Sequence, residues 1–382
     1  MTAGGALVAE YDVVVIGGGC AGCATALALA RQGAARVLIV EAGNYAAVRI
    51  GETIPPDTRR VLHDLGVLLD FIAEAHEPSL GSCSSWGSDE LGYNDFLFNP
   101  LGHGWHLERA RFDAFLARKA AESGAELRTG TRIAQVEGQG GGFRLRLTDD
   151  DGRNAIAETR FVVDATGMRS SFARRLGAKR LFVDQLLCVM GYFELPDAGF
   201  SRLTILEAVP YGWWYAAKLP NRRVAVAVAS DAAIVKQAAL HRRDGWLSHL
   251  AQTQHVSVAL AGALPIGGSL LTCAAPSFRL DAAAGENWIA VGDAACAFDP
   301  ISSQGIYKAL NDGTEAARAI ADCLAGKRET LDAYRAAVTE RFEAYLENRN
   351  YFYRLEGRWP ASAFWSRRRA RTTYGRAELQ DA

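Results

Sequence analysis

Lysine is scarce in this sequence, and its scarcity excludes some chemistry. The 382 residues include 42 lysines and arginines together. Only six of these are lysine, and they stand at Lys119, Lys179, Lys218, Lys236, Lys308 and Lys327. Because no lysine precedes Lys119, a reaction that needs a lysine in the first 118 residues is excluded.

Charge, apolar runs and cysteine patterns exclude further functions. A net charge of −1 gives no whole-chain attraction to nucleic acid or to an anionic membrane. No apolar run is long enough to cross a bilayer, and the N-terminal MTAGGALVAEYD lacks the features of a signal peptide. The seven cysteines are odd in number, scattered and without zinc-like spacing. We therefore expect a cytoplasmic protein without nucleic-acid, membrane or metal partners.

A glycine-rich loop near the N-terminus is the first positive signal. In YDVVVIGGGCAGCATALALARQG, a buried strand is followed by G-x-G-x-x-G at Gly17, Gly19 and Gly22 and then by a helix. Glu41 ends the next apolar strand, where an acidic side chain accepts hydrogen bonds from ribose hydroxyls. This pattern predicts a βαβ unit that binds the pyrophosphate of a dinucleotide. Its C-x-x-C spacing, Cys20 to Cys23, is better explained by packing at the helix start than by a redox pair.

The remaining sequence predicts two interleaved domains. Strand-like runs such as CVMGYFEL, RLTILEAV, GWWYAAKL and RVAVAVAS indicate a mainly antiparallel sheet inserted into the nucleotide-binding domain, and the last fifty residues have a helical pattern. The nucleotide-binding domain is predicted to comprise residues 9–80, 104–182 and 268–325, the sheet domain residues 81–103 and 183–267, and the helical region residues 326–382.

Two further segments narrow the cofactor to FAD. FVVDATGMRSS (161–171) resembles the D-A-T-G-x-x-S segment of flavin monooxygenases, and ENWIAVGDAACAFDPISSQGIYKAL (286–310) resembles the G-D-A-A…D-P…S-x-G segment of the same superfamily. The resemblance implies a Rossmann-like FAD-binding domain of the glutathione reductase type, similar to p-hydroxybenzoate hydroxylase. It also implies cofactor contacts from Gly17, Gly19, Gly22, Glu41, Arg109, Asp164, Gly167, Gly292, Asp293, Pro300, Gly305 and Ile306.

Within this superfamily, GETIPP (51–56) resembles the G-E-x-x-P-P segment of flavin-dependent halogenases and their hydroxylating relatives. Halogenases carry a lysine between this segment and the following strands, and a W-x-W-x-I-P motif in the sheet. This chain has no lysine there, and it has Tyr215 and Ala217 at the two tryptophan positions. Halogenation is therefore disfavoured. GETIPP, GWWYAAKLP and DPISSQGIYKALNDG look most like flavoproteins that mature tryptophylquinone cofactors.

The resemblance implies hydroxylation of an indole ring through a flavin C4a-hydroperoxide formed with O2. The substrate would be a tryptophan side chain in a quinoprotein precursor, and electrons would come from NAD(P)H or a separate flavin reductase. Three alternatives remain open besides halogenation. They are a small-molecule aromatic hydroxylase or oxidase, a reductase of isoprenoid double bonds, and a flavin-binding assembly factor without catalysis.

The sequence also proposes catalytic and substrate-binding residues. Glu52, His103 and Tyr215 are catalytic candidates, beside His106 and Glu207, although Glu52 could equally be a cap. Candidate substrate contacts are Trp86, Trp213, Trp214 and Lys218.

In YGWWYAAKLP, strand alternation places Tyr211, Trp213 and Tyr215 on one face and Trp214, Ala216 and Lys218 on the other, without deciding which face lines the site. The basic segment 366–376, near Trp359 and Trp365, is either a solvated chain end or a docking site for an acidic partner.

Overall fold

The apolar run before the glycine loop forms the centre of the first sheet. The computed structural model describes residues 8–33, 36–196 and 199–369. Strand β1 (Val8–Ile16) lies parallel to β2 (Val37–Val40) on one side and to β11 (Asn154–Asp164) on the other. A continuous β-branched run suits this place because a central parallel strand is covered on both faces.

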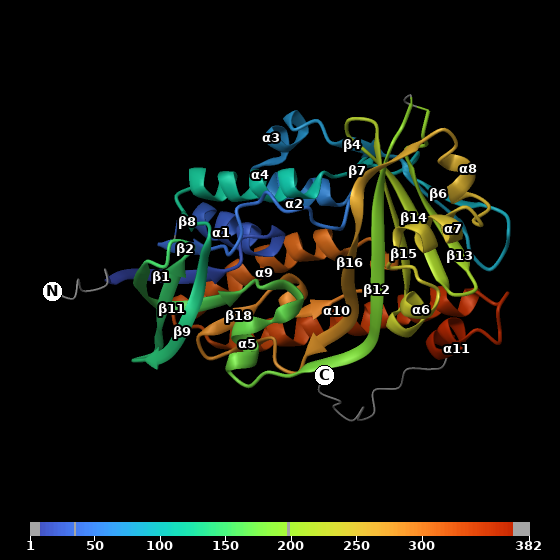
Figure 1. The fold of residues 1–382 in the computed structure, drawn as a ribbon. Helices are drawn as coiled ribbons and strands as arrows, with labels where there is room; N and C mark the ends of the chain where they lie inside the picture. Colours follow the sequence, from blue (N-terminus) through green and yellow to red (C-terminus); the bar gives the residue numbers. More distant parts are fainter. Residues whose placement is uncertain (1–7, 34–35, 197–198, 370–382) are drawn as a thin grey trace.

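Further strands extend this first sheet, and helices pack against it (Figure 1). The spatial order is β17 (Ala284–Gly285), β18 (Trp288–Ala290), β11, β1, β2 and β8 (Glu126–Arg128), with β10 (Gly142–Asp149) pairing β11 and β9 (Thr131–Gln139). The helices of this part are α1 (Cys20–Arg31), α4 (Arg109–Glu122), α5 (Ser171–Arg175) and α9 (Gly305–Leu324). Helix α1 packs closely on α9, where a Cβ on Gly313 would lie 2.6 Å from the Ala21 carbonyl oxygen.

The second sheet is antiparallel except for one parallel pair, β13 with β5. Its spatial order is β19 (Cys296–Ala297), β16 (Leu264–Leu280), β12 (Arg180–Glu194), β15 (Arg223–Asp231), β14 (Gly212–Leu219), β13 (Leu203–Val209), β5 (Gly81–Ser85) and β6 (Gly92–Asp95). A small third sheet has the order β3 (Thr53–Ile54), β7 (Gly104–His106) and β4 (Glu77–Ser79). The other helices are α2 (Thr58–Asp64), α3 (Leu68–Ala73), α6 (Ala232–Gln237), α7 (Arg243–Leu250), α8 (Val256–Ala259), α10 (Glu329–Leu355) and α11 (Ala363–Arg369), with short 3-10 turns η1 (Gly167–Arg169), η2 (Gly292–Ala294) and η3 (Pro300–Ser302).

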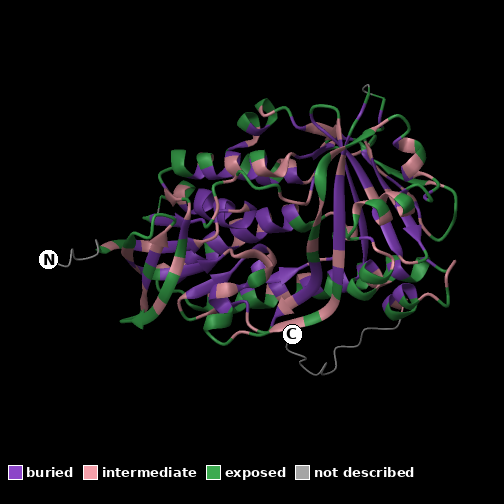
Figure 2. Cartoon of the chain, in the orientation of Figure 1, coloured by how far each residue is buried: buried purple, intermediate pink, exposed green. Residues whose placement is uncertain are grey.

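The predicted fold class is confirmed: an α/β fold with a Rossmann-like part, an inserted mainly antiparallel sheet and C-terminal helices. The predicted domain boundaries stay a prediction. Two of them, at 182/183 and 267/268, fall inside β12 and β16, the long strands that run side by side between the two parts (Figure 1). Burial is greatest in the central strands of the two sheets, such as β1, β2, β14 and β15, whereas β9 is largely exposed (Figure 2).

The aromatic segment 211–220 divides its side chains between two environments. Strand β14 begins at Gly212, and Trp214 packs edge-on against Trp246 in the core on one face. Trp213 belongs to a separate cluster on the other face. The prediction that Tyr211 shares the face of Trp213 is wrong. Tyr211 lies in the turn before the strand, outside its alternation, and its hydroxyl accepts a hydrogen bond from Trp214 Nε1 at 3.2 Å.

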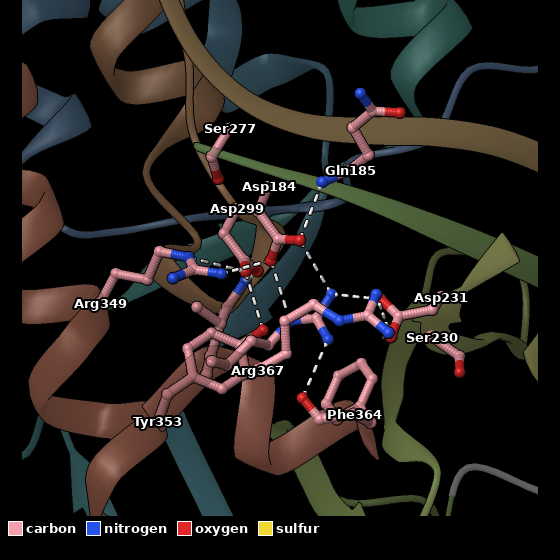
Figure 3. Close-up of polar contacts among 12 residues, drawn as sticks. Asp184, Gln185, Ser230, Asp231, Ser277, Asp299, Arg349, Tyr353, Phe364 and Arg367 are labelled. Carbon is pink, nitrogen blue, oxygen red and sulfur yellow. Dashed lines mark hydrogen bonds and ion pairs between the residues drawn. The ribbon is translucent and has the colours of Figure 1, made fainter. Parts of the chain in front are cut away.

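Helix α11 is tied to the second sheet by charged side chains. Arg368 of α11 is only 3% exposed, and its guanidinium bonds Asp184 of β12 at 2.8 Å and Asp231 of β15 at 2.6 Å. Arg349 of α10 joins the same network through Asp184 and Asp299 (Figure 3).

This arrangement corrects the two interpretations of the basic tail at Arg368 and Trp365, whereas Ser366 and Arg367 are exposed. Arg368 and Trp365 are buried, so neither is a solvated end or a docking contact. Residues 370–376 of that segment lie outside the described residues. Within the described ranges, no helix has both the length and the apolar character to cross a membrane.

Replacing Arg368 should destabilise the fold far more than replacing its neighbour. Arg368→Met leaves the buried Asp231 and the partly buried Asp184 with less compensating charge, so we expect a loss of roughly 3–5 kcal/mol in the free energy of unfolding. Arg367→Met is the matched control. The Arg367 side chain is 63% exposed and contacts Asp231 at 3.1 Å, and a solvated pair contributes about 1 kcal/mol or less. Denaturant unfolding measures both, and equal losses would contradict this account.

Candidate active site

A cavity of about 1120 Å³ lies between the two sheets. Its walls come from the glycine loop, the segment 48–53 and the start of α9 on one side, and from β12, β14, β15 and β16 on the other. Pockets for drug-sized ligands enclose ~300–1,000 Å³, so this cavity has room for a large cofactor together with a substrate.

The glycine loop forms one end of this cavity. Gly17 has φ of +110°, and a Cβ there would lie 2.3 Å from the Ala165 carbonyl oxygen; a Cβ on Gly22 would lie 2.0 Å from the Gly17 carbonyl oxygen. These two glycines are needed for the turn and for close packing. A Cβ on Gly19 would meet only Arg49 Nη1, at 3.7 Å, so Gly19 faces open space in the cavity. Helix α1 begins directly after it without a side-chain cap, which leaves first-turn N–H groups for a phosphate.

Glu41 lies beside the loop at the end of β2. Its carboxylate accepts hydrogen bonds from the backbone N–H groups of Gly18 at 2.7 Å and Gly43 at 2.8 Å, and it lines the cavity. Arg49 lies next to it, 3.4 Å from Glu41 and 2.9 Å from Asp113. Arg49 was missed by sequence reasoning because it stands in the irregular segment between β2 and β3, where no periodicity marks it.

The predicted cofactor residues fall into two groups. Gly17, Gly19, Glu41, Arg109, Gly167, Asp293, Pro300, Gly305 and Ile306 line the cavity. Gly22, Asp164 and Gly292 lie behind its surface. The Asp164 carboxylate accepts bonds from the N–H groups of Thr166, Phe172 and Ala173, and the Gly292 N–H donates to Asp312 at 3.1 Å. These three residues shape the site without lining it.

Arg109, the first residue of α4, contributes a positive charge that is only partly exposed. Its Nη1 donates to the Ile50 carbonyl at 2.8 Å and its Nη2 lies 3.3 Å from Asp113 Oδ1. Arg109 Nε is buried without a hydrogen-bond partner among the described residues. An open glycine loop, an uncapped helix start and an unpartnered guanidinium nitrogen at one cavity fit the pyrophosphate and ring system of FAD.

Glu52 is the acidic group at the centre of the site. It is 4% exposed, and its carboxylate accepts a bond from the Gly51 N–H at 3.1 Å. Burial raises the pKa of Glu52 to about 7, although the charge of Arg109 opposes this rise. A carboxyl group with a pKa near neutrality can either accept or donate a proton at physiological pH.

Tyr215 opens a chain of hydroxyl groups that leads from the cavity into the protein. Its hydroxyl lies 2.8 Å from Thr53 Oγ1, which lies 3.3 Å from Thr204 Oγ1. Thr204 Oγ1 is 3.0 Å from Nε2 of the fully buried His106. Burial lowers the pKa of His106 to about 4, so its ring is neutral near pH 7. The chain can therefore pass a proton between the cavity and a neutral imidazole.

The second sheet supplies an aromatic and apolar wall. Trp213 and Tyr215 of β14 line it together with Met190 of β12 and Leu271 of β16, and Trp213 Nε1 donates to the Tyr353 hydroxyl at 3.3 Å. Sequence reasoning missed Met190 and its neighbours Cys188 and Cys273. Alternation along CVMGYFEL could have grouped Cys188 with Met190, but it could not tell which face of the strand is the cavity wall.

Four predicted site residues are not brought to the cavity. His103 lies just before β7, and its Nδ1 is 2.7 Å from the Gly104 carbonyl oxygen. Trp86 donates to the Phe352 carbonyl at 2.7 Å and packs on Trp365. Trp214 is in the core, and Lys218 Nζ lies 3.4 Å from Glu77. We do not carry these four residues into the proposed site.

Glu207, the other acid considered, has a structural position: it accepts bonds from the N–H groups of residues 254–256 before and at the start of α8. Two further absences hold within the described residues. None of the residues that line the cavity is a lysine, and no group of three or more His, Cys, Asp and Glu side chains could hold a metal ion.

Comparison with known proteins agrees with this geometry. The tryptophan halogenase family matches residues 88–380, and the family of FAD dependent oxidoreductases matches residues 12–51, which hold the glycine loop. LodB of Marinomonas mediterranea, to which an FAD-dependent oxidoreductase activity is attributed, is 29% identical over 362 residues, covering 94% of this chain and 97% of LodB.

Solved structures show the same fold. The myxobacterial chondrochloren halogenase CndH superimposes with a TM-score of 0.87 at 25% identity, covering 94% of this chain and 86% of CndH. QhpG, a peptidyl tryptophan dihydroxylase essential for tryptophylquinone cofactor biogenesis, superimposes with a TM-score of 0.77 at 24% identity, covering 97% of this chain and 81% of QhpG. The protein is thus an FAD-dependent oxidoreductase, and it belongs to the tryptophan halogenase family.

Proposed function

We propose that this protein is a monooxygenase that hydroxylates an aromatic ring, the indole of a tryptophan side chain in a partner protein. The observation that carries the proposal is the composition of the cavity. It combines the aromatic wall of Trp213 and Tyr215 with the buried acid Glu52, and no described lining residue is a lysine. Electrons would come from NAD(P)H or a separate flavin reductase, and the second substrate would be O2.

The absence of a lysine from the described lining residues of the cavity supports hydroxylation over chlorination or bromination. Halogenases of this family need a lysine to carry the hypohalous species. Lys308 is buried behind the cavity, where Nζ donates to the Cys296 carbonyl at 2.7 Å. Lys218 lies on the opposite face of β14 from Trp213. Neither lysine is in position to face an aromatic ring in the cavity.

Bound FAD would supply the activation of oxygen. The FAD would be held by the glycine loop, Glu41, Arg109 and the start of α9. The protein's own part is to orient the ring, exclude water and move protons. Trp213 and Tyr215 would stack on the indole ring. Glu52 would take the proton that leaves the ring carbon on hydroxylation, and the hydroxyl chain from Tyr215 would return a proton to the cavity.

A protein substrate is favoured over a small molecule by the likeness to QhpG, which acts on a peptidyl tryptophan. That likeness covers nearly the whole of this chain. The resemblance of GETIPP, GWWYAAKLP and DPISSQGIYKALNDG to maturation flavoproteins points to the same substrate class. The larger TM-score of the halogenase CndH makes halogenation the alternative that an experiment must separate.

Mass spectrometry of a co-expressed quinoprotein precursor tests this function. We expect the target tryptophan to gain the mass of one or two oxygen atoms when the enzyme and FAD are both present. A precursor in which that tryptophan is replaced by phenylalanine is the control and should gain none. An unmodified tryptophan, or one with the isotope pattern of chlorine or bromine, would reject the proposal.

Glu52→Gln should remove a pH-dependent loss of stability. The wild-type carboxyl has a pKa of about 7 in the folded state and an ordinary value of 4.5. Ionisation therefore favours the unfolded state as pH rises from 4.5 to 7. The resulting loss in the free energy of unfolding amounts to roughly 3 kcal/mol between pH 4.5 and 8. In thermal unfolding, wild type should lose more stability over this pH range than Glu52→Gln does. The kcat of Glu52→Gln should be lower than that of wild type. Parallel pH profiles for the two proteins would show that the carboxyl is not perturbed.

A further inference from the structure

Two cysteines face each other across neighbouring strands in the wall of the cavity. Cys188 of β12 is directly opposite Cys273 of β16 in the antiparallel register, and both residues line the cavity. The register is regular at this point, because its two shifts lie at 182/184 and 190/192. Directly opposed residues in antiparallel strands have Cα atoms ~4.5–5.5 Å apart, within the ~4.4–6.8 Å that a disulfide spans. The backbone thus already has the geometry that a bond between the two sulfur atoms needs.

The two thiols have different environments. Cys188 is 4% exposed, whereas Cys273 is half-buried, so Cys273 is the more accessible of the two. A hydrogen bond from the Cys188 thiol lowers the pKa of Cys273, and the same bond together with burial raises the pKa of Cys188. Cys273 is therefore suited to attack an oxidant as a thiolate, and Cys188 is suited to react with the oxidised Cys273 and form a disulfide.

The C-x-x-C motif in the glycine loop has the spacing of a redox pair, but its thiols lie in a different environment. Cys20 and Cys23 lie in the first turn of α1, where the Cys20 thiol donates to Asp113 and the Cys23 thiol to the Gly18 carbonyl, both at 3.1 Å. Burial is the main cause that raises the pKa of both. A protonated thiol held by an acceptor is a poor nucleophile. The C-x-x-C spacing therefore provides an internal control for the cavity pair.

We propose that Cys188 and Cys273 form a peroxide-reactive dithiol in the cavity wall. Cys273 sulfur attacks hydrogen peroxide: an S–O bond forms, the O–O bond breaks, and the leaving hydroxide takes a proton to give water. Cys188 sulfur then attacks Cys273 sulfur, so that an S–S bond forms and the S–O bond breaks. The second hydroxide leaves as water with the Cys188 proton. Two thiols lose two electrons, one peroxide gains them, and an external dithiol reductant reverses the change.

The location gives this chemistry a use. Oxygen chemistry that fails to reach an aromatic ring releases peroxide into the same cavity. The Cys273 thiol consumes that peroxide, and disulfide formation then removes the sulfenic acid before Cys273 reaches the irreversible sulfinic state. It also cross-links β12 to β16 beside Met190 and Leu271, which form the apolar wall. The site itself needs only peroxide and the two thiols, so it does not depend on which substrate is hydroxylated.

The test is thiol mapping of the FAD-loaded full-length protein after addition of hydrogen peroxide. Acid quenching, alkylation and peptide mass spectrometry should find a peptide pair joined through Cys188 and Cys273. Cys20 and Cys23 should stay alkylatable. Cys273 should react with hydrogen peroxide about tenfold faster than the buried Cys83 of β5. The thiolate is the reactive form, and the pKa of Cys273 is lowered whereas burial raises that of Cys83.

Variants separate the two roles. In Cys188→Ser, Cys273 should stop at the sulfenic acid, which dimedone traps. In Cys273→Ser, Cys188 should stay reduced. Cys83→Ser, a buried cysteine of the same sheet, is the matched control and should form the disulfide like wild type. Cys188 and Cys273 that remain alkylatable in wild type, or a disulfide between Cys20 and Cys23 instead, would overturn the proposal. Because the peroxide is added, that failure would leave the hydroxylation proposal untouched.

Discussion

The pairing of β12 with β16 is the interaction on which the rest of the site depends. The two strands pair from Arg180↔Leu280 to Glu194↔Leu264 within the second sheet, and they run between the nucleotide-binding part and the rest of that sheet (Figure 1). Because side chains alternate along a strand, a slip of one residue would exchange the cavity face for the core face. The observed register places Cys188, Met190, Leu271 and Cys273 in the wall above the glycine loop. The partly buried Asp184 and the buried Arg349 and Arg368 then fix the N-terminal part of β12 against the C-terminal helices.

Burial is the second constraint, and it sets the chemistry of the titratable groups. Glu52 has little access to water, and this is the main reason that its pKa lies near neutrality. Its charge also raises the pKa of Tyr215, after burial itself. His106 is kept neutral by the same effect. The cavity thus has a carboxyl whose pKa lies near neutrality, and a chain of hydroxyl groups connects it to a neutral imidazole behind its wall, a set suited to proton movement.

The sequence predicted the fold class, and nine of the twelve residues that it predicted for the cofactor line the cavity, because both predictions depend on local patterns. The steric need for Gly17 and Gly22 follows from a tight strand-to-helix turn, which G-x-G-x-x-G encodes directly. The faces of β14 could be grouped by alternation, but only tertiary packing decides that Trp213 meets the cavity and Trp214 the core. His103 and Trp86 were predicted as site residues but do not line the cavity. An aromatic or titratable residue in a loop carries no information on its distance from the site. The Cys188–Cys273 pairing and the burial of Arg368 required a register and a docked helix, neither of which is readable from spacing.

The central claim is that this cavity delivers oxygen, and not halogen, to an aromatic ring. The most direct measurement is turnover of the FAD-loaded enzyme under 18O2 with bromide present, a reductant for the flavin, and a tryptophan-containing precursor as substrate. Our account predicts a product whose added oxygen carries the 18O label and which contains no bromine. A brominated indole, or an added oxygen that comes from water, would contradict it.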